Sequence, residues 1–569
     1  MKSPWSPRRS GSRSTAKGDD GYGGMQLYAS PPASGDAPPA AAAAFGGSVS
    51  RYVAGTQFYN HEMYGSLRTG GEVRFYSIEC IGLVAAVFSS AFSFQSLQGV
   101  LRPLMSSKLN LTKQENVAVQ RLIELPMALS FFVGLLSDCY PILGLRRKAY
   151  MIVGMLLNAS CVLAMAGISA HFEAQEAKHE TPDQRLVTLL LVLSAFASVG
   201  CIITYLCVHT RVIELSQRES LRNRGAIQVS YLVFRRLTSL VTASYSYLTL
   251  GSGAAGSEPN MKLSNATLLL ACVSLVPLPV ILKYWHEEHY SLPNTMKVRA
   301  QIFWKIMQQR AVWGILAFIS FFALFLAVKF ADSANAVRSW TSGAANDNSL
   351  LLKTIQDVTM LLTILAWRYW FMNKSWRAFF CWAPFLQVVP QLLASALVSF
   401  DVVRDRYAYR AIMSVSFIAD GITTLNNVAP LVEIIQEGSE GATVGLVLSL
   451  QRLIGVFVST NAQGLFRGEQ YYTPSEVKLD TRSVRVNVFW SLVLNYGINL
   501  VALVGLLWLP AQKLDAQQQR MYGGFTKGAS AAIIVFATVL FSYSAVINVM
   551  SFVPGLACYP IAGGEGCAR

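Results

Sequence analysis

Ionisable side chains stand at the centres of several long apolar stretches, where charge is costly and usually meets a partner or a water-filled cavity. Arg121 and Glu124 share one stretch, three residues apart on one helical face, so they can pair with each other or line a site. Asp420 and Arg452 lie centrally in two later stretches. We therefore predict that Arg121, Asp420 and Arg452 contact a solute. The acids Glu124 and Asp420 are candidates for proton coupling.

Two further positions belong to this set, and each has a structural alternative. Arg235 and Arg236 are adjacent, so their side chains diverge by about 100° on a helix and only one of them can face a cavity. We take Arg235 as the candidate. Asn426 is a candidate solute contact, although asparagine in a membrane more often bonds one helix to another. Arg452 can likewise bridge to an acid on a neighbouring helix.

The segment GLLSDCYPILGLRRK at 134–148 carries a pattern that suits a gate between helices. Gly134 permits close helix approach, and Asp138 can cap a helix or pair with an arginine across a bundle. Gly144 supplies a turn. The basic cluster Arg146, Arg147 and Lys148 holds the loop at the anionic leaflet of a membrane. The alternative is an ordinary basic hairpin, but the spacing favours a cytoplasmic gate formed by these six residues.

These residues require a membrane-embedded helical scaffold. The chain of 569 residues is 53% hydrophobic and only 14% charged, against about 25% charged in soluble domains. Its apolar residues come in blocks of about 20, the length of a membrane-spanning helix. We predict thirteen spans, at 77–101, 114–136, 149–170, 186–209, 225–249, 265–283, 310–332, 350–372, 377–398, 408–431, 442–465, 486–509 and 529–552. The fold class is an all-α polytopic membrane protein.

Charge and spacing divide the chain into five parts. Residues 1–74 are rich in Ser, Gly, Pro and Ala and predict a disordered tail, which the positive-inside rule places in the cytoplasm. A six-helix half follows, then a polar cytoplasmic connector and a second half, which is the arrangement of the major facilitator superfamily. The thirteenth helix is additional. The predicted parts are 1–74, 75–283, 284–309, 310–510 and 511–569.

Four motifs in order resemble the folate-biopterin transporter family of that superfamily. They are LSDCYPILGLRRKAY at 136–150, FSFQSLQGVLRPLMSSKLNLTKQE at 92–115, VIELSQRESLRNRGAIQ at 212–228 and EGSEGATVGLVLSL at 437–450. The long tails resemble those of divergent oomycete and protist members. The sequence departs from the family pattern at Ser130 and Phe131, where members often have Lys-Pro, and at His209, where they tend to have Asp.

The resemblance implies a solute with a flat pterin ring and, in folate, a carboxylate tail. Such a site needs arginine for the carboxylate, an acid or amide for the ring edge and aromatic faces for stacking. The residues of those types are Arg121, Arg235, Arg452, Asp420, Asn426 and Asn427, with Tyr231, Phe234, Tyr245 and Trp367 for stacking.

We therefore predict a secondary active transporter of folate, biopterin or a related solute, working by alternating access and coupled to protons, with its N-terminus in the cytoplasm. The plasma membrane is the expected location. Alternatives are a carrier of the same fold for an amino acid, nucleoside, S-adenosylmethionine or sugar, and a non-transporting sensor or scaffold. No motif indicates an enzyme, a cofactor, a metal site or nucleic-acid binding. The expected partners are the lipid bilayer, the solute and protons, and the oligomeric state is left open.

Overall fold

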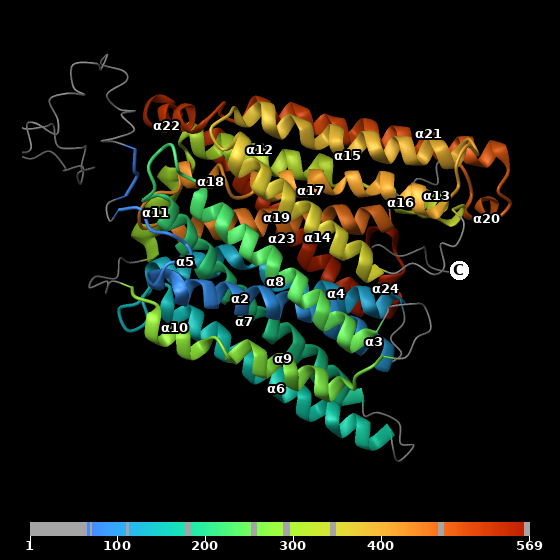
Figure 1. Ribbon diagram of the computed structural model, residues 1–569, viewed down its shortest axis with the longest axis horizontal. Coiled ribbons are helices and arrows are strands. Elements are labelled where there is room, and N and C mark those ends of the chain that lie inside the picture. The colour runs from blue at the N-terminus through green and yellow to red at the C-terminus, as the bar shows by residue number, and fades with distance from the viewer. Residues whose placement is uncertain are drawn as a thin grey trace, which may run out of the picture. The chain divides into compact units, whose positions relative to one another are not determined.

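The computed structural model describes residues 65–68, 71–109, 113–176, 184–251, 259–287, 296–341, 349–464 and 471–562. Within these ranges the chain forms helices, with two isolated β-bridges and no strand. The helices run side by side across the view in Figure 1. This all-helical architecture agrees with the predicted fold class.

We call residues 78–284 the N-lobe. Its elements are η3 (Ile78–Cys80), α2 (Ile81–Ser96), η4 (Leu97–Leu101), α3 (Arg102–Lys108), α4 (Lys113–Ala128), α5 (Ser130–Cys139), α6 (Lys148–Glu176), α7 (Gln184–Ser216), α8 (Ala226–Leu250), α9 (Leu263–Leu275) and α10 (Leu278–Tyr284). The first span is continuous from Ile78 to Lys108 but changes to a π-helix over η4. Pro126 lies inside α4, just before the interruption at Leu129 that separates α4 from α5.

We call residues 310–507 the C-lobe, and α11 (Met296–Met307) precedes it. Its elements are α12 (Arg310–Leu326), α13 (Ala331–Ser339), α14 (Ser349–Ala366), η6 (Trp367–Phe371), α15 (Trp376–Ser399), α16 (Arg406–Val415), α17 (Phe417–Asn426), α18 (Leu431–Ile434), α19 (Glu440–Gln463), α20 (Pro474–Val477), α21 (Arg482–Leu500) and η7 (Val501–Leu507). The chain then continues through α22 (Lys513–Tyr522), α23 (Lys527–Phe552), α24 (Pro554–Ala557) and η8 (Pro560–Ala562).

The predicted number of spans is not confirmed. In the described ranges, nine helices are long and apolar enough to cross a membrane, or ten if α12 and α13, which meet at a 43° bend, form one span. The predicted spans 225–249, 350–372 and 408–431 are occupied by helices but do not pass that test. The physical reason is polarity, because α8, α14 and α16–α17 carry charged and amide side chains in mid-helix.

The lobes meet along two seams. Helix α5 packs against α19, and α8 packs against α14. The largest apolar cluster spans both lobes and includes Met151 and Val229 from the N-lobe and Ile315 and Leu450 from the C-lobe. Packing across the seams therefore ties the two lobes together in this conformation.

The last long helix, α23, packs against α4 of the N-lobe and α19 of the C-lobe. Its Leu540 joins a cluster with Ala128 of α4 and with Leu453 and Val458 of α19. After α23, Cys558 is disulfide-bonded, whereas Cys567, the other cysteine of the C-terminal loop, lies outside the described residues.

Two pieces of the predicted N-terminal tail, 65–68 and 71–74, are among the described residues and contact the bundle. The backbone N–H groups of Leu67 and Arg68 donate to the carbonyl oxygen of Gln217. The carboxylate of Glu72 accepts from the backbone N–H of Ser220. This segment therefore reaches the loop between α7 and α8.

Candidate functional site

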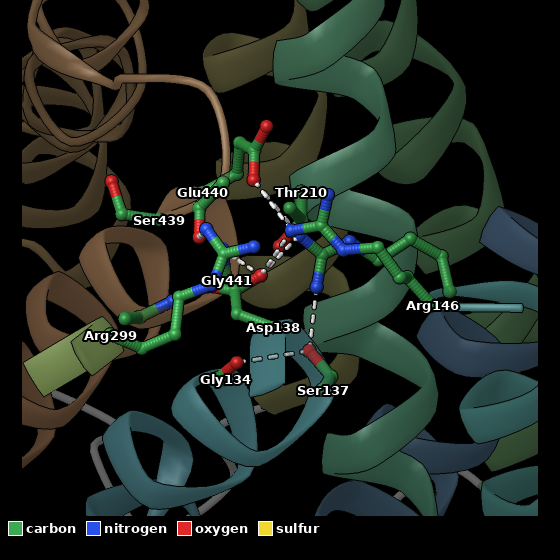
Figure 2. Close-up of polar contacts among 12 residues, drawn as sticks. Gly134, Ser137, Asp138, Arg146, Thr210, Arg299, Ser439, Glu440 and Gly441 are labelled. Atoms are coloured by element: carbon green, nitrogen blue, oxygen red, sulfur yellow. Dashed lines mark hydrogen bonds and ion pairs between the residues drawn. The ribbon is translucent and has the colours of Figure 1, made fainter. Parts of the chain in front are cut away.

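Acids and arginines from several helices meet where the end of α5 lies against the start of α19. Arg146 Nη2 lies 3.0 Å from Asp138 Oδ1 and 3.0 Å from Glu440 Oε2. Arg147 Nη2 lies 2.6 Å from Asp138 Oδ1, and its Nε lies 3.3 Å from Glu214 Oε1. We call these five residues the clasp; Figure 2 shows Asp138, Arg146 and Glu440 pointing toward one another. The clasp joins the N-lobe to the C-lobe.

Asp138 also caps the helix of the opposite lobe. Its carboxylate accepts the backbone N–H groups of Gly441 at 3.2 Å and of Ala442 at 2.8 Å, at the first turn of α19. The first N–H groups of a helix have no partner within it and carry its positive dipole end, so a carboxylate there is favourable. Asp138 therefore binds α19 by charge and by hydrogen bonds at once.

All five clasp residues are buried. Burial alone would lower the pKa of Arg147, but Asp138, Glu214 and Glu440 together raise that pKa well above its usual value. Arg147 therefore stays charged at every physiological pH. A buried charge that loses its partner costs about 3–5 kcal/mol, so separating α5 from α19 requires the arginines to find water or new partners.

The two helices approach so closely because glycines face each other. A Cβ atom on Gly441 would lie only 2.7 Å from the carbonyl oxygen of Gly134, and a Cβ atom on Gly134 would clash with the backbone of Gly441. Small residues allow helix backbones to come together in membranes. The predicted role of Gly134 in close approach thus corresponds to a real contact, and its partner is Gly441.

The remaining predicted gate residues lie beside the clasp rather than in it. Gly144 has φ 77° and shapes the turn before α6. Lys148 Nζ donates to the carbonyl oxygens of Leu282 and Trp285, both in or next to α10 of the same lobe. The carboxylate of Glu287 accepts the backbone N–H of Lys148 at 2.7 Å and so caps α6.

Three residues were not among the predicted gate residues: two members of the clasp, Glu214 and Glu440, and Arg68, which contacts it. Glu214 and Glu440 stand in motifs that were noted for their family pattern alone. Arg68, from the predicted tail, forms an ion pair with Glu440. A search for acids at the ends of spans would have found Glu214 and Glu440, whereas no local signal marks Arg68.

A cavity of about 650 Å³ lies between the lobes. Its lining comes from α2, η4, α3, α4 and α8 of the N-lobe and from α14, α17 and the link between α12 and α13 of the C-lobe. The lining residues are Gln95, Gln98, Gly99, Arg102, Gln120, Ile123, Glu124, Arg236, Ser239, Lys329, Lys353, Gln356, Asp357, Met360, Asp420, Thr423 and Thr424. Most of these side chains are polar or charged.

The acids of the cavity have partners. Asp357 accepts from Arg236 Nη1 at 3.1 Å and from the Ser239 hydroxyl at 2.6 Å. Asp420 accepts from Gln356 Nε2 at 2.8 Å. Glu124 forms an ion pair with Arg452 across the seam between α4 and α19. These contacts hold α8 to α14, α14 to α17 and α4 to α19 around the empty volume.

The cavity is separated from the clasp along the helices. Glu124 and Asp138 lie in consecutive helices of one span, fourteen residues apart, which corresponds to about 21 Å along a helix axis. The clasp therefore closes one end of the seam, and the cavity lies toward the other end, which we call the far end.

Of the predicted solute and proton residues, Asp420 and Glu124 line the cavity. Arg121 is instead buried among the C-terminal elements, where its guanidinium donates to Ser551 Oγ, to Thr460 Oγ1 and to the carbonyl oxygen of Ala562. Arg452 reaches Glu124 from outside the lining. An Arg121–Glu124 pair, which was one of the two alternatives for these residues, does not form, because each side chain finds a partner elsewhere.

The two adjacent arginines of α8 diverge as expected, but Arg236 faces the cavity and Arg235 does not. Arg235 donates to the Tyr205 hydroxyl at 2.7 Å and lies 4.5 Å from the centre of that ring. The side chain of Asn426 is buried, and its Oδ1 has no hydrogen-bond partner among the described residues. Neither Arg235 nor Asn426 lines the cavity.

The residues considered for aromatic stacking pack elsewhere. Tyr231 lies against His209, with 3.3 Å between its hydroxyl and His209 Nδ1. Tyr245 donates to the carbonyl oxygen of Ala266. Neither these tyrosines nor Phe234 and Trp367 line the cavity, and its described lining contains no aromatic side chain.

Sequence reasoning missed several charged lining residues, namely Arg102, Lys329, Lys353 and Asp357. A signal for one of them was present, because Asp357 lies well inside the predicted span 350–372. Lys329 and Lys353 lie near the ends of predicted spans, where lysine is common and carries little information. In the described part of the chain, no group of three His, Cys, Asp or Glu residues is placed to hold a metal ion.

The chain is similar to a known protein family in sequence and to solved structures in fold. The model of the BT1 family matches residues 94–521. Among solved structures, the proton:xylose symporter XylE of the major facilitator superfamily, bound to 6-bromo-6-deoxy-D-glucose, is 11% identical with a TM-score of 0.50, covering 80% of this chain and 98% of that one. A bacterial homologue of the iron transporter ferroportin in its outward-facing state is 14% identical with a TM-score of 0.49, covering 76% and 99%. No curated protein is a significant match to the sequence.

Proposed function

The chain belongs to the BT1 family, and we propose on this basis that it carries a pterin-like organic solute, such as folate or biopterin, across a membrane by alternating access. The predicted membership of the folate-biopterin transporter family is confirmed, and with it the major facilitator fold. The protein is therefore a membrane transporter, and the solute and its coupling are our proposals.

The cavity between the lobes is the observation that carries this proposal. Its volume of about 650 Å³ falls in the range of small-molecule sites, and both lobes contribute to its lining. A solute bound there contacts both moving bodies, as alternating access requires. Asp420 and the amides of Gln95 and Gln356 offer acceptors and donors for the edge of a pterin ring.

We assign the gate to the clasp. Asp138, Arg146, Arg147 and Glu440 close one end of the seam in this conformation, and parting them opens that end. The basic residues around the clasp favour the cytoplasmic side by the positive-inside rule, and on this ground we propose a cytoplasmic N-terminus. The plasma membrane is our proposed location.

We assign proton coupling to Glu124 and Asp420. Both line the cavity, and Glu124 pairs with Arg452 across the α4–α19 seam. Protonation of Glu124 removes the charge that holds Arg452, so proton binding and separation of α4 from α19 are linked.

Uptake by the purified protein in liposomes tests this function. We expect labelled folate or biopterin to accumulate, and an inward proton gradient to accelerate the uptake. Glu124→Gln should abolish the response to the gradient, while Glu437→Gln, an exposed acid outside the cavity, should leave it intact. Absence of uptake for both compounds would refute the solute, and uptake that ignores the gradient would refute the coupling.

A second candidate is a polar solute without a flat ring, such as an amino acid or a sugar. It is favoured by the described lining, which offers no aromatic face for stacking. Competition of folate uptake by a panel that includes amino acids, nucleosides, S-adenosylmethionine and sugars separates the two solute classes.

A further inference from the structure

The cavity carries more positive charge than its acids neutralise. Four cations and three acids line it. The Asp357 carboxylate is matched by Arg236, and Glu124 is matched by Arg452, which lies outside the lining. The remaining cations of the lining are Arg102, Lys329 and Lys353, and the remaining acid is Asp420.

None of these three cations forms an ion pair within the described residues. Arg102 donates to the carbonyl oxygen of Gln98 at 3.3 Å and to Gln120 Oε1 at 2.5 Å, both of which are neutral acceptors. Lys329 interacts with Asp420 through space without direct contact. Two positive charges thus remain in excess, and because Lys329 and Lys353 are exposed, their ammonium groups are accessible to an anion that enters the cavity.

The three cations lie toward the far end of the cavity. Lys353 precedes Asp357 by one helical turn on α14, on the side away from the clasp, which is about 6 Å along the axis. Arg102 follows Gln95 and Gln98 in the first span, also away from the clasp, and Lys329 lies in the link that leaves α12 at the same end. The deeper part of the cavity holds the matched Arg236–Asp357 pair.

Lys353 reaches across the seam to the other lobe. A Cβ atom on Gly99 would lie 3.0 Å from Lys353 Nζ, so the ammonium group rests over the π-helical segment η4 at the one residue there that lacks a side chain. Such π-helical turns often occur at functional sites. Arg102 belongs to the N-lobe, whereas Lys329 and Lys353 belong to the C-lobe, so an anion at this end contacts both.

We propose that Arg102, Lys329 and Lys353 form an anion subsite at the far end of the cavity, which binds the carboxylates of a solute that carries two negative charges. This assignment rests on the proposed function, because the subsite determines the charge of the solute that the same cavity binds. An anion held by all three side chains draws the far ends of the lobes together, so the subsite couples solute charge to closure.

Equilibrium binding to the purified full-length protein tests the subsite. The probes are folate, which carries two carboxylates, and biopterin, which is uncharged. We expect Lys353→Gln and Lys329→Gln each to weaken folate binding about tenfold, the usual effect of losing one charge-assisted hydrogen bond, and to weaken biopterin binding much less. Lys353→Arg should retain folate. The matched control is Lys374→Gln, an exposed lysine in the turn before α15.

Gly99→Ala is a second variant that keeps every charge. The added methyl group displaces the flexible end of Lys353 rather than backbone, so the protein should fold while its folate affinity falls more than its biopterin affinity. Equal folate affinity in Lys353→Gln, Lys329→Gln and the unaltered protein would overturn the subsite. Equal losses for both probes, or a native protein that does not bind folate, would overturn it too.

Liposome uptake separates this result from the proposed function. Charge-dependent folate binding without any uptake would refute the transport of folate and leave the subsite standing. Folate uptake that is the same in the native protein and in Lys353→Gln would refute the subsite and leave the transporter standing.

Discussion

The contact between Gly134 and Gly441 makes a quantitative prediction about the clasp. In Gly134→Ala the new methyl group meets the backbone of α19, which cannot rotate away, so α5 and α19 must separate. Overpacking of this kind costs about 1–3 kcal/mol. If only the clasped conformation carries that cost, the equilibrium between clasped and open conformations shifts by about 5- to 150-fold.

A cysteine at the clasp reports this shift. Cys139 is free and follows Asp138 directly, and its side chain is 0% exposed in the clasped conformation. We expect a maleimide reagent to modify Cys139 faster in Gly134→Ala, in proportion to the population of the open conformation. Quantitative mass spectrometry of the Cys139 peptide gives the rate.

Gly455→Ala is the matched control. Gly455 also lies in α19, but a Cβ atom there meets nothing within 4 Å, so this variant shares the change in helix propensity without the clash. Size-exclusion chromatography verifies that both variants fold. Equal labelling of Cys139 in the two variants would refute the reasoning, because it would mean that the glycine contact does not control opening of the clasp.

Three further predictions concern other parts of the molecule. Glu440→Gln removes the acid shared by buried arginines, a change worth about 3–5 kcal/mol, and should increase labelling at the clasp in the same assay, while the exposed Glu437→Gln should not. Burial raises the pKa of Glu219 to about 7, so the folded state binds a proton more tightly than the unfolded state does. The free energy of unfolding should therefore fall as the pH rises from about 4.5 to 7, by on the order of 3 kcal/mol. Thermal unfolding in detergent measures this fall, and Glu219→Gln should remove it; a stability that rises over that interval would contradict the assignment. Arg121→Gln removes hydrogen bonds worth about 1–3 kcal/mol from the C-terminal segment, so limited proteolysis should cleave the residues near Ala562 faster than in the native protein, and an unchanged rate would exclude an anchoring role.

The helical fold could be predicted from the sequence because the pattern that specifies each helix lies within that helix. Apolar blocks of membrane-spanning length identify helices one at a time, and their polar interruptions identify the connector between the lobes. The test of apolarity fails for α8, α14 and α16–α17, and α8, α14 and α17 carry part of the polar lining of the cavity. Hydropathy therefore identifies least well three of the helices that line the cavity.

The candidate site could be predicted from the sequence only in part. Gly134, Asp138, Arg146 and Arg147 lie within one short segment, so their pattern could be recognised directly. The neighbours of Arg121, by contrast, are Thr460, Ser551 and Ala562, which are hundreds of residues distant in sequence. No periodicity indicates which face of a buried helix meets a cavity, because every face of such a helix is covered. That choice depends on the packing of the whole bundle, as Arg235 and Arg236 illustrate.

The position of α23 has a consequence for the lipids around the protein. This helix packs against both α4 and α19, so it stands between acyl chains and the seam there and hinders their lateral entry. At the opposite seam, between α8 and α14, no helix within the described residues packs against both partners in this way. The additional helix thus makes the two membrane-facing seams unequal.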